Sequence, residues 1–151
     1  MTTHSKTVLD RRAVFMLIAV GLLSGVGLRA QDSGVIAHDG WVRVPLPSKT
    51  ETALFVVLEN HSKERRAVVS ASSDAAEKVE MHEMKMDRTM MVMKPVSEIG
   101  IPAKGKTALS SNGFHLMMFG LKTRPAVGDT ITVTLKLDNG ETVPVKAEVR
   151  K

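Results

Sequence analysis

The feature that most constrains the fold is a pair of alternating segments near the end of the chain. Polar and apolar residues alternate over residues 130–137 and again over residues 142–149. Between them lies Asp138-Asn139-Gly140, which supplies residues that tolerate the positive φ angles of a tight turn. A period of two residues places alternate side chains on opposite faces of a strand. The sequence therefore predicts a β-hairpin here.

The preceding sequence continues in the same manner. Short apolar or β-branched runs are separated by turn residues such as Gly, Pro, Asn and Asp, and no segment has a helical period longer than about two turns. We expect eight or nine strands and a single all-β sandwich or barrel. The predicted strands before the hairpin cover residues 41–44, 52–58, 66–71, 78–86, 89–96, 107–109 and 114–121, and residues 31–40 are expected to form a flexible lead-in.

Residues 1–30 have the composition of a secretory signal. Lys6, Arg11 and Arg12 precede an uncharged apolar run over residues 13–28, and Ala30 provides a small residue at the expected cleavage site. The run is shorter than the roughly 20 residues needed to cross a bilayer, although a retained membrane anchor is the alternative. We therefore divide the chain into a signal peptide, 1–30, and a β domain, 31–151. The domain is expected to be periplasmic and soluble, with no stable membrane insertion.

Charge and cysteine content exclude several classes of protein. The whole chain has 21 basic and 16 acidic residues, but residues 1–30 hold four of the bases and one of the acids. The remaining 17 bases and 15 acids give a charge of only +2, so there is no basis for predicting nucleic-acid binding. The absence of cysteine excludes a disulfide, a thiolate nucleophile and a lipid-bearing cysteine.

Methionine and histidine are concentrated in two of the predicted strands. Six of the ten methionines lie between positions 81 and 93. Strand alternation places His82, Met84 and Met86 on one face, and His115 and Met117 on one face of a later strand. With a turn at residues 87–88, position 82 is expected opposite position 93, and position 84 opposite position 91. One hairpin and one further strand could then present two imidazoles and several thioethers together.

These donors favour Cu(I). Thioether sulfur is soft and uncharged, and imidazole is borderline, so the set suits a soft monovalent ion. Zinc sites more often use thiolates, imidazoles and carboxylates, and calcium and magnesium need oxygen ligands. The zinc-protease motif is absent because Met86 stands where its second histidine would be. We expect Met81, Met90 and Met118 to serve in packing, and His38 and His61 to be surface residues.

The spacing of four of these residues resembles that of a known family. Ten residues separate His82 from Met93, twenty-one separate Met93 from His115, and one separates His115 from Met117. This spacing resembles the pattern of the periplasmic copper chaperones called PCu(A)C. The resemblance implies a cupredoxin-like Greek-key β-barrel in which these four side chains bind one Cu(I) ion. It also implies a non-enzymatic role in delivering copper to the CuA centre of cytochrome c oxidase subunit II, alongside a Sco-type thiol protein.

Two other functions remain open from the sequence. The same site could serve an envelope copper buffer that delivers to no acceptor. Alternatively, the methionines could be packing or a partner surface on a structural β module. Under the copper interpretation, Met84, Met86 and Met91 are nearby thioethers that could assist capture or release.

Overall fold

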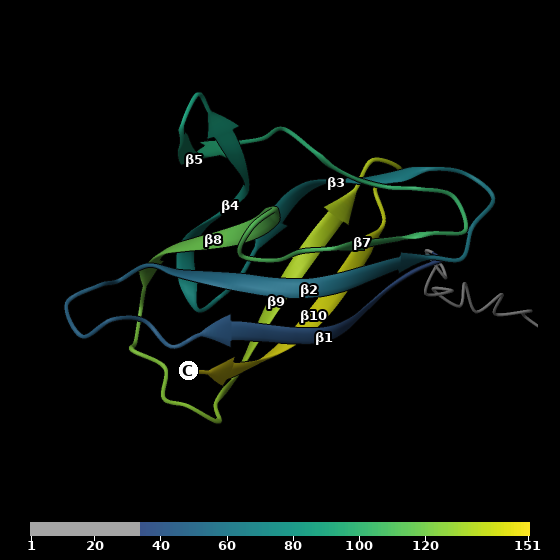
Figure 1. Ribbon diagram of the computed structural model, residues 1–151. Helices are drawn as coiled ribbons and strands as arrows, with labels where there is room; N and C mark the ends of the chain where they lie inside the picture. Colours follow the sequence, from purple (N-terminus) through teal and green to yellow (C-terminus); the bar gives the residue numbers. More distant parts are fainter. Residues whose placement is uncertain (1–33) are drawn as a thin grey trace, which may run out of the picture.

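The computed structural model describes residues 34–151, which form ten β-strands and no helix (Figure 1). None of these residues belongs to a helix long and apolar enough to cross a membrane. The predicted signal peptide, residues 1–30, lies outside the described residues. The strands are β1 (Val35–Arg43), β2 (Thr52–Asn60), β3 (Arg66–Ser72), β4 (Ala76–Asp87), β5 (Met90–Pro95), β6 (Ile99–Ile101), β7 (Lys106–Ala108), β8 (Phe114–Leu121), β9 (Thr130–Leu137) and β10 (Thr142–Arg150).

Seven of the strands close into a barrel. Their order is β4-β8-β2-β1-β10-β9-β3, and pairing of Ala71 with Val79 joins β3 back to β4. The β1–β10 pair is parallel, with Trp41 opposite Glu148, whereas the other neighbours in the barrel are antiparallel. This confirms the prediction of an all-β, cupredoxin-like Greek-key barrel. Closure leaves the barrel strands without free sheet edges along most of their length.

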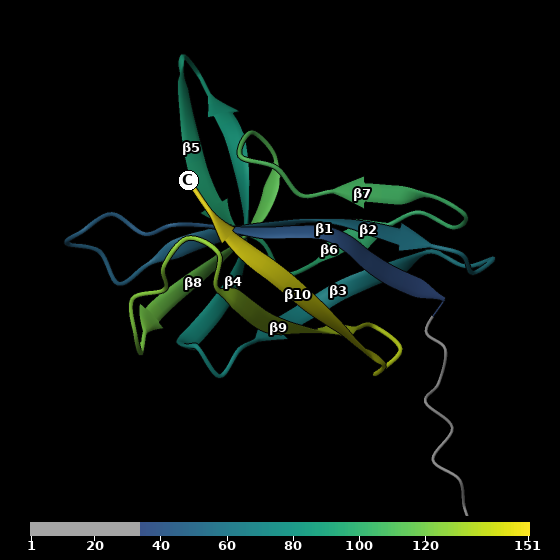
Figure 2. The same cartoon turned by 90° about the horizontal axis from the view of Figure 1, so that it is seen from below.

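The other three strands lie at the margins of the barrel. β5 pairs with β4, β6 with β3, and β7 with β2. The β4–β5 hairpin extends beyond the body of the barrel in two perpendicular views (Figures 1 and 2). Because β5 is the terminal strand of its side of the sheet, its outer edge pairs with no further strand among the described residues.

The barrel encloses an aliphatic core. In β10 every second residue is buried, as the alternating sequence requires. In β8 the buried Leu116 and Met118 belong to this core, and in β4 so does Met81. Their sequence neighbours His82, His115 and Met117 consequently point to the outside of the barrel. The inward-facing methionines confirm the packing roles predicted for Met81 and Met118.

The C-terminal hairpin forms as predicted, whereas the flexible lead-in does not. β9 spans the predicted residues, and Gly140 has a φ of 85° in the turn before β10. Residues 31–40 were expected to be unstructured, but β1 begins at Val35, which pairs with Asn60. The register of β1 shifts between His38 and Trp41, where Asp39 has a φ of 54°. This irregularity interrupts the polar–apolar alternation, so the sequence pattern did not indicate a strand.

Met90 is a second correction. It was assigned to packing with Met81 and Met118, but its side chain is 65% exposed on β5. The strand belongs to the projecting hairpin rather than to the barrel, so both of its faces meet solvent over much of its length.

A pair of methionine variants should distinguish the two environments. Met118 is fully buried, so we expect Met118→Ala to lower the free energy of unfolding by about 2–5 kcal/mol through lost contacts and a residual cavity. Met90→Ala should change it by less than about 0.5 kcal/mol. Denaturant unfolding followed by circular dichroism measures both. Equal losses in the two variants would contradict the placement of these side chains.

Candidate metal centre

His82 and His115 lie side by side on the outer surface of the barrel. They are directly paired across β4 and β8, and the centroids of their rings are 6.0 Å apart. Although they point away from the core, they are only 8% and 4% exposed. Two imidazoles at this separation can each direct one nitrogen to a shared ion, since metal–nitrogen bonds are about 2.0–2.1 Å long.

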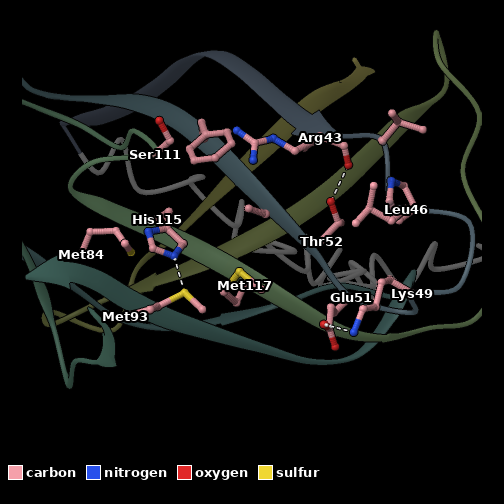
Figure 3. A pocket seen from close by; sticks show the side chains of 14 residues that line it. Arg43, Leu46, Lys49, Glu51, Thr52, Met84, Met93, Ser111, His115 and Met117 are labelled. Carbon is pink, nitrogen blue, oxygen red and sulfur yellow. Dashed lines mark hydrogen bonds and ion pairs between the residues drawn. The ribbon is translucent and has the colours of Figure 1, made fainter. Parts of the chain in front are cut away.

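Met93 brings a thioether to the same place. Its Sδ lies 3.0 Å from Nε2 of His115 (Figure 3). With metal–sulfur bonds of about 2.3 Å and metal–nitrogen bonds of about 2.0–2.1 Å, two donors on one tetrahedral ion lie roughly 3.5 Å apart. The observed separation is close to that value, so a small shift would let both donors contact one ion.

The register of the β4–β5 hairpin differs from the predicted one by two residues. Position 82 was expected opposite position 93, but His82 pairs with Pro95, and Met93 pairs with Met84. The turn falls one residue later than expected because Arg88 adopts a left-handed φ of 58°, which lets Asp87 pair with Met90. A shift of two residues preserves the face of every side chain, so Met84 and Met93 still share a face with His82.

Met117 lies on the same face of β8 as His115 and lines a pocket with it. It follows His115 by two residues on β8 and sits beside Ala53 of β2. Met84, Met93, His115 and Met117 line one pocket of about 430 Å³ (Figure 3). His82 does not line this pocket and lies next to His115 at its margin. The structure thus gathers the four predicted ligands in one region, and their ligation of a metal remains a prediction.

Hydrogen bonds orient the His115 ring. Its Nδ1 lies 3.1 Å from the carbonyl oxygen of Gly113, which can only accept, so Nδ1 carries the proton. The same carbonyl accepts the backbone N–H of Met84 at 3.0 Å, which ties the β4–β5 hairpin to the start of β8. In the neutral ring Nε2 then has a free lone pair, and this is the atom that faces Met93.

In His82 the hydrogen-bonded nitrogen is Nε2, whereas in His115 it is Nδ1. Nε2 of His82 donates to Oε2 of Glu80 at 2.9 Å, which leaves the lone pair on Nδ1 of the neutral ring. Nδ1 is buried and has no hydrogen-bond partner among residues 34–151. A buried polar atom without a partner is costly in a protein interior. A bound cation would satisfy it.

The surroundings of His115 favour its neutral form. Burial lowers the pKa of His115 below its ordinary value of 6.5, with a smaller effect of His82 in the same direction and an opposing effect of the Gly113 carbonyl. Hydrogen bonds from Lys78 and from His82 lower the pKa of Glu80, so this carboxylate stays ionised as the partner of His82. Neutral imidazole is the form that binds metals.

The donors gathered here are soft or borderline. Within residues 34–151 there is no group of three or more His, Cys, Asp or Glu side chains that could hold a metal ion. Two imidazoles with thioethers form a neutral set that suits Cu(I).

Aromatic side chains cover the inner flank of the centre. Phe55 of β2 lies with its ring centroid 6.3 Å from that of His115, and Trp41 of β1 packs on Phe55 at 4.6 Å. The guanidinium of Arg43 lies over the Phe55 ring at 5.6 Å. These rings exclude water from one side of His115, which accounts for much of its burial on an outer surface.

Comparison with known proteins assigns the family. The family model described as "LpqE-like: Putative lipoprotein LpqE-like" matches residues 35–149, which is most of the chain. The chain belongs to the LpqE-like family. A relative in Leifsonia xyli subsp. xyli (strain CTCB07), named "Putative lipoprotein Lxx21020", is 32% identical over 121 residues, which cover 80% of this chain and 72% of the relative.

Solved structures similar to this LpqE-like chain include PCuAC domains. The copper-bound PCuAC domain from PmoF2 matches with a TM-score of 0.67 and 18% identity, over 78% of this chain and 92% of that domain. The solution structure of CuI-DR1885 from Deinococcus radiodurans matches with a TM-score of 0.61 and 32% identity, over 83% of each chain. The resemblance to the PCu(A)C family is confirmed. The 151 residues of the LpqE-like chain contain no cysteine.

Sequence reasoning missed two residues of this LpqE-like centre. Glu80, which holds His82, lies two residues before it on the same strand face, so alternation alone could have identified it. Phe55 could not have been found in this way, because its contact with His115 depends on the pairing of β2 with β8. Of the auxiliary methionines, Met84 lines the pocket, whereas Met86 and Met91 pair with each other farther along the hairpin.

His115 should make the stability of the metal-free protein depend on pH. Its pKa in the folded protein lies below 6.5, so at pH values between the two the unfolded chain binds a proton that the folded chain does not. Stability should therefore fall as the pH drops from 6.5 through the folded pKa. Denaturant unfolding across this range measures the loss, which should be smaller in His115→Gln. The lowered pKa of Glu80 affects the free energy of unfolding only below pH 4.5, so its effect can be measured separately from that of His115. Identical pH profiles for the two proteins would contradict the burial effect.

Proposed function

We propose that this protein is a non-enzymatic, exported carrier of Cu(I). One ion is held by His82, Met93, His115 and Met117 and is delivered to an acceptor outside the cytoplasm. The observation that carries the proposal is the approach of Met93 Sδ to the free lone pair of His115 Nε2, together with the unpartnered Nδ1 of the neighbouring His82. The similarity to a copper-bound PCuAC domain and to CuI-DR1885 supports it.

The exposed position of one ligand suits a carrier. Met93 lies on β5, the terminal strand of the sheet, and is 47% exposed. The histidines, by contrast, are fixed on barrel strands and by hydrogen bonds to Gly113 and Glu80. A site with two fixed imidazoles and a thioether at an accessible edge can open on one side to exchange its ion. Neutral donors should also bind less tightly than thiolates, which favours release.

The proposed location is the periplasm, and the proposed acceptor is the CuA centre of cytochrome c oxidase subunit II. A Sco-type thiol protein is the second proposed partner. Export is supported by the lipoprotein description of the family and by the signal-like sequence of residues 1–30. The delivery role rests on the PCu(A)C relationship. A buffer that sequesters copper without delivering it would use the same centre.

Replacing His115 tests the centre directly. Anaerobic titration with Cu(I) against a chromophoric chelator should give one ion per wild-type protein. His115→Ala should weaken binding by more than the roughly 10–100-fold that loss of an outer-sphere partner costs, with an unchanged β-sheet circular dichroism spectrum. His61→Ala is the matched control, because His61 is exposed and follows the opposite end of β2. Unchanged affinity in His115→Ala would reject the assignment.

Glu80 should act through His82. Removal of the carboxylate frees the His82 ring to rotate and to change its protonated nitrogen, so Glu80→Ala should lower Cu(I) affinity by about 10–100-fold. Glu80→Gln keeps an oxygen acceptor and should recover most of the affinity. Glu83→Ala is the control, since Glu83 lies on the opposite face of β4 and pairs with Lys85. Equal affinities in the Glu80→Ala and Glu83→Ala proteins would refute the orienting role.

Deletion of the gene distinguishes a Cu(I) carrier from a copper buffer. A carrier predicts reduced cytochrome c oxidase activity at low copper, restored by added copper. Normal oxidase activity combined with increased sensitivity to copper would favour the buffer.

A further inference from the structure

The outer half of the β4–β5 hairpin carries a second pair of thioethers on the same face as the metal centre. Met86 is directly opposite Met91, as Met84 is opposite Met93 one step closer to the barrel. Because both strands alternate, these four side chains share the face of His82. They form two successive thioether pairs that lead from the hairpin tip to the histidines.

The outer pair is not explained by packing. Met86 is 63% exposed and Met91 is 45% exposed, and neither belongs to the core cluster of the described residues. The opposite face of the hairpin has ordinary surface chemistry, with ion pairs from Lys85 to Glu83 at 3.1 Å and from Lys94 to Asp87 at 3.7 Å. The face of His82 therefore carries two thioether pairs and none of these charges, whereas the opposite face carries the ion pairs and the single thioether of Met90.

The geometry of an antiparallel pair lets both sulfurs reach one ion. Directly opposed residues have Cβ atoms about 4.5–5.5 Å apart, and methionine has three rotatable bonds with which to adjust its sulfur. Successive pairs on one face are separated by two residues, or roughly 7 Å along the strand. Because methionine side chains are long and flexible, sulfur atoms from two successive pairs can approach the same ion across this distance.

We propose that Met86 and Met91 form a second, weaker site for a soft monovalent cation, through which Cu(I) enters and leaves the centre. The ion passes from this outer pair to Met84 and Met93, and from Met93 to His115, whose Nε2 is 3.0 Å from Met93 Sδ. Each step exchanges one neutral donor for another, so no proton or electron is transferred. The direction of this route rests on the proposed Cu(I) function.

Affinity should increase along the route. The outer pair supplies two thioethers on an exposed hairpin, whereas the inner centre adds two imidazoles held by Gly113 and Glu80. Fixed donors lose less conformational freedom on binding than mobile ones. An ion captured at the tip would therefore move inward, and an acceptor that contacts the tip could draw it out without opening the barrel.

The test compares Met86→Leu/Met91→Leu with Met90→Leu. Leucine conserves volume but lacks sulfur, and all three positions are exposed, so folding should be unaffected. Met90 is the matched control, because it lies on the same hairpin but on the opposite face. Methyl-labelled methionine should report a first equivalent of Cu(I) at Met93 and Met117, and excess Cu(I) at Met86 and Met91 but not at Met90.

Kinetics provide the second measurement. Transfer of Cu(I) from a small chelator to the metal-free protein should slow by about tenfold in Met86→Leu/Met91→Leu, equivalent to about 1.4 kcal/mol in the barrier, with unchanged affinity of the tight site. Met90→Leu should match wild type. If the double variant transfers as fast as Met90→Leu, or the Met86 and Met91 methyls do not respond, the outer site is rejected.

Two further outcomes identify which proposal has failed. The Cu(I) centre itself is wrong if the wild-type protein does not bind the first equivalent of Cu(I). It is also wrong if the His115→Ala protein binds that equivalent as tightly as wild type. If the double variant slows transfer only to a protein acceptor, with no methyl response to Cu(I), the methionine face is a docking surface and the outer metal site is rejected.

Discussion

The pairing of β4 with β8 is the constraint on which the centre depends. It sets His82 directly against His115 and, through strand alternation, simultaneously directs Met81 and Leu116 into the core. The hydrophobic residues fix the register, because a slip of one residue would move them to solvent and the histidines into the barrel. The free energy that holds the imidazoles together is therefore supplied by aliphatic packing on the other face of the same strands.

The centre also depends on local hydrogen bonds that the packing does not determine. The carbonyl oxygen of Gly113 accepts hydrogen bonds from the His115 ring and from the backbone N–H of Met84. The Glu80 carboxylate accepts one from the protonated ring nitrogen of His82. These contacts decide which nitrogen of each ring is free. An uncharged, partly buried donor set follows from them, with ionised groups kept to the surrounding surface. Cu(I) is the ion that this chemistry fits best.

Much of this arrangement could be predicted from the sequence, because strand alternation is a local property. It identified the shared faces of the histidines and methionines, the C-terminal hairpin and the all-β character of residues 34–151. The register of the β4–β5 hairpin could not be predicted, since it depends on the left-handed conformation of Arg88. The exposure of Met90 and the contact of Phe55 with His115 depend on which strands are neighbours. Residues 35–40 were misassigned because a register shift interrupts their alternation.

The absence of ionisable donors other than imidazole at the centre has a consequence for recognition. A thiolate or carboxylate site neutralises its cargo, whereas neutral sulfur and nitrogen atoms leave the charge of a monovalent ion in place. Loading would thus make this end of the barrel one unit more positive. The carboxylate nearest the centre is Glu80, which holds His82 and is shared with Lys78, and Glu83 pairs with Lys85. An acidic acceptor surface could in this way distinguish full from empty molecules by electrostatic attraction alone.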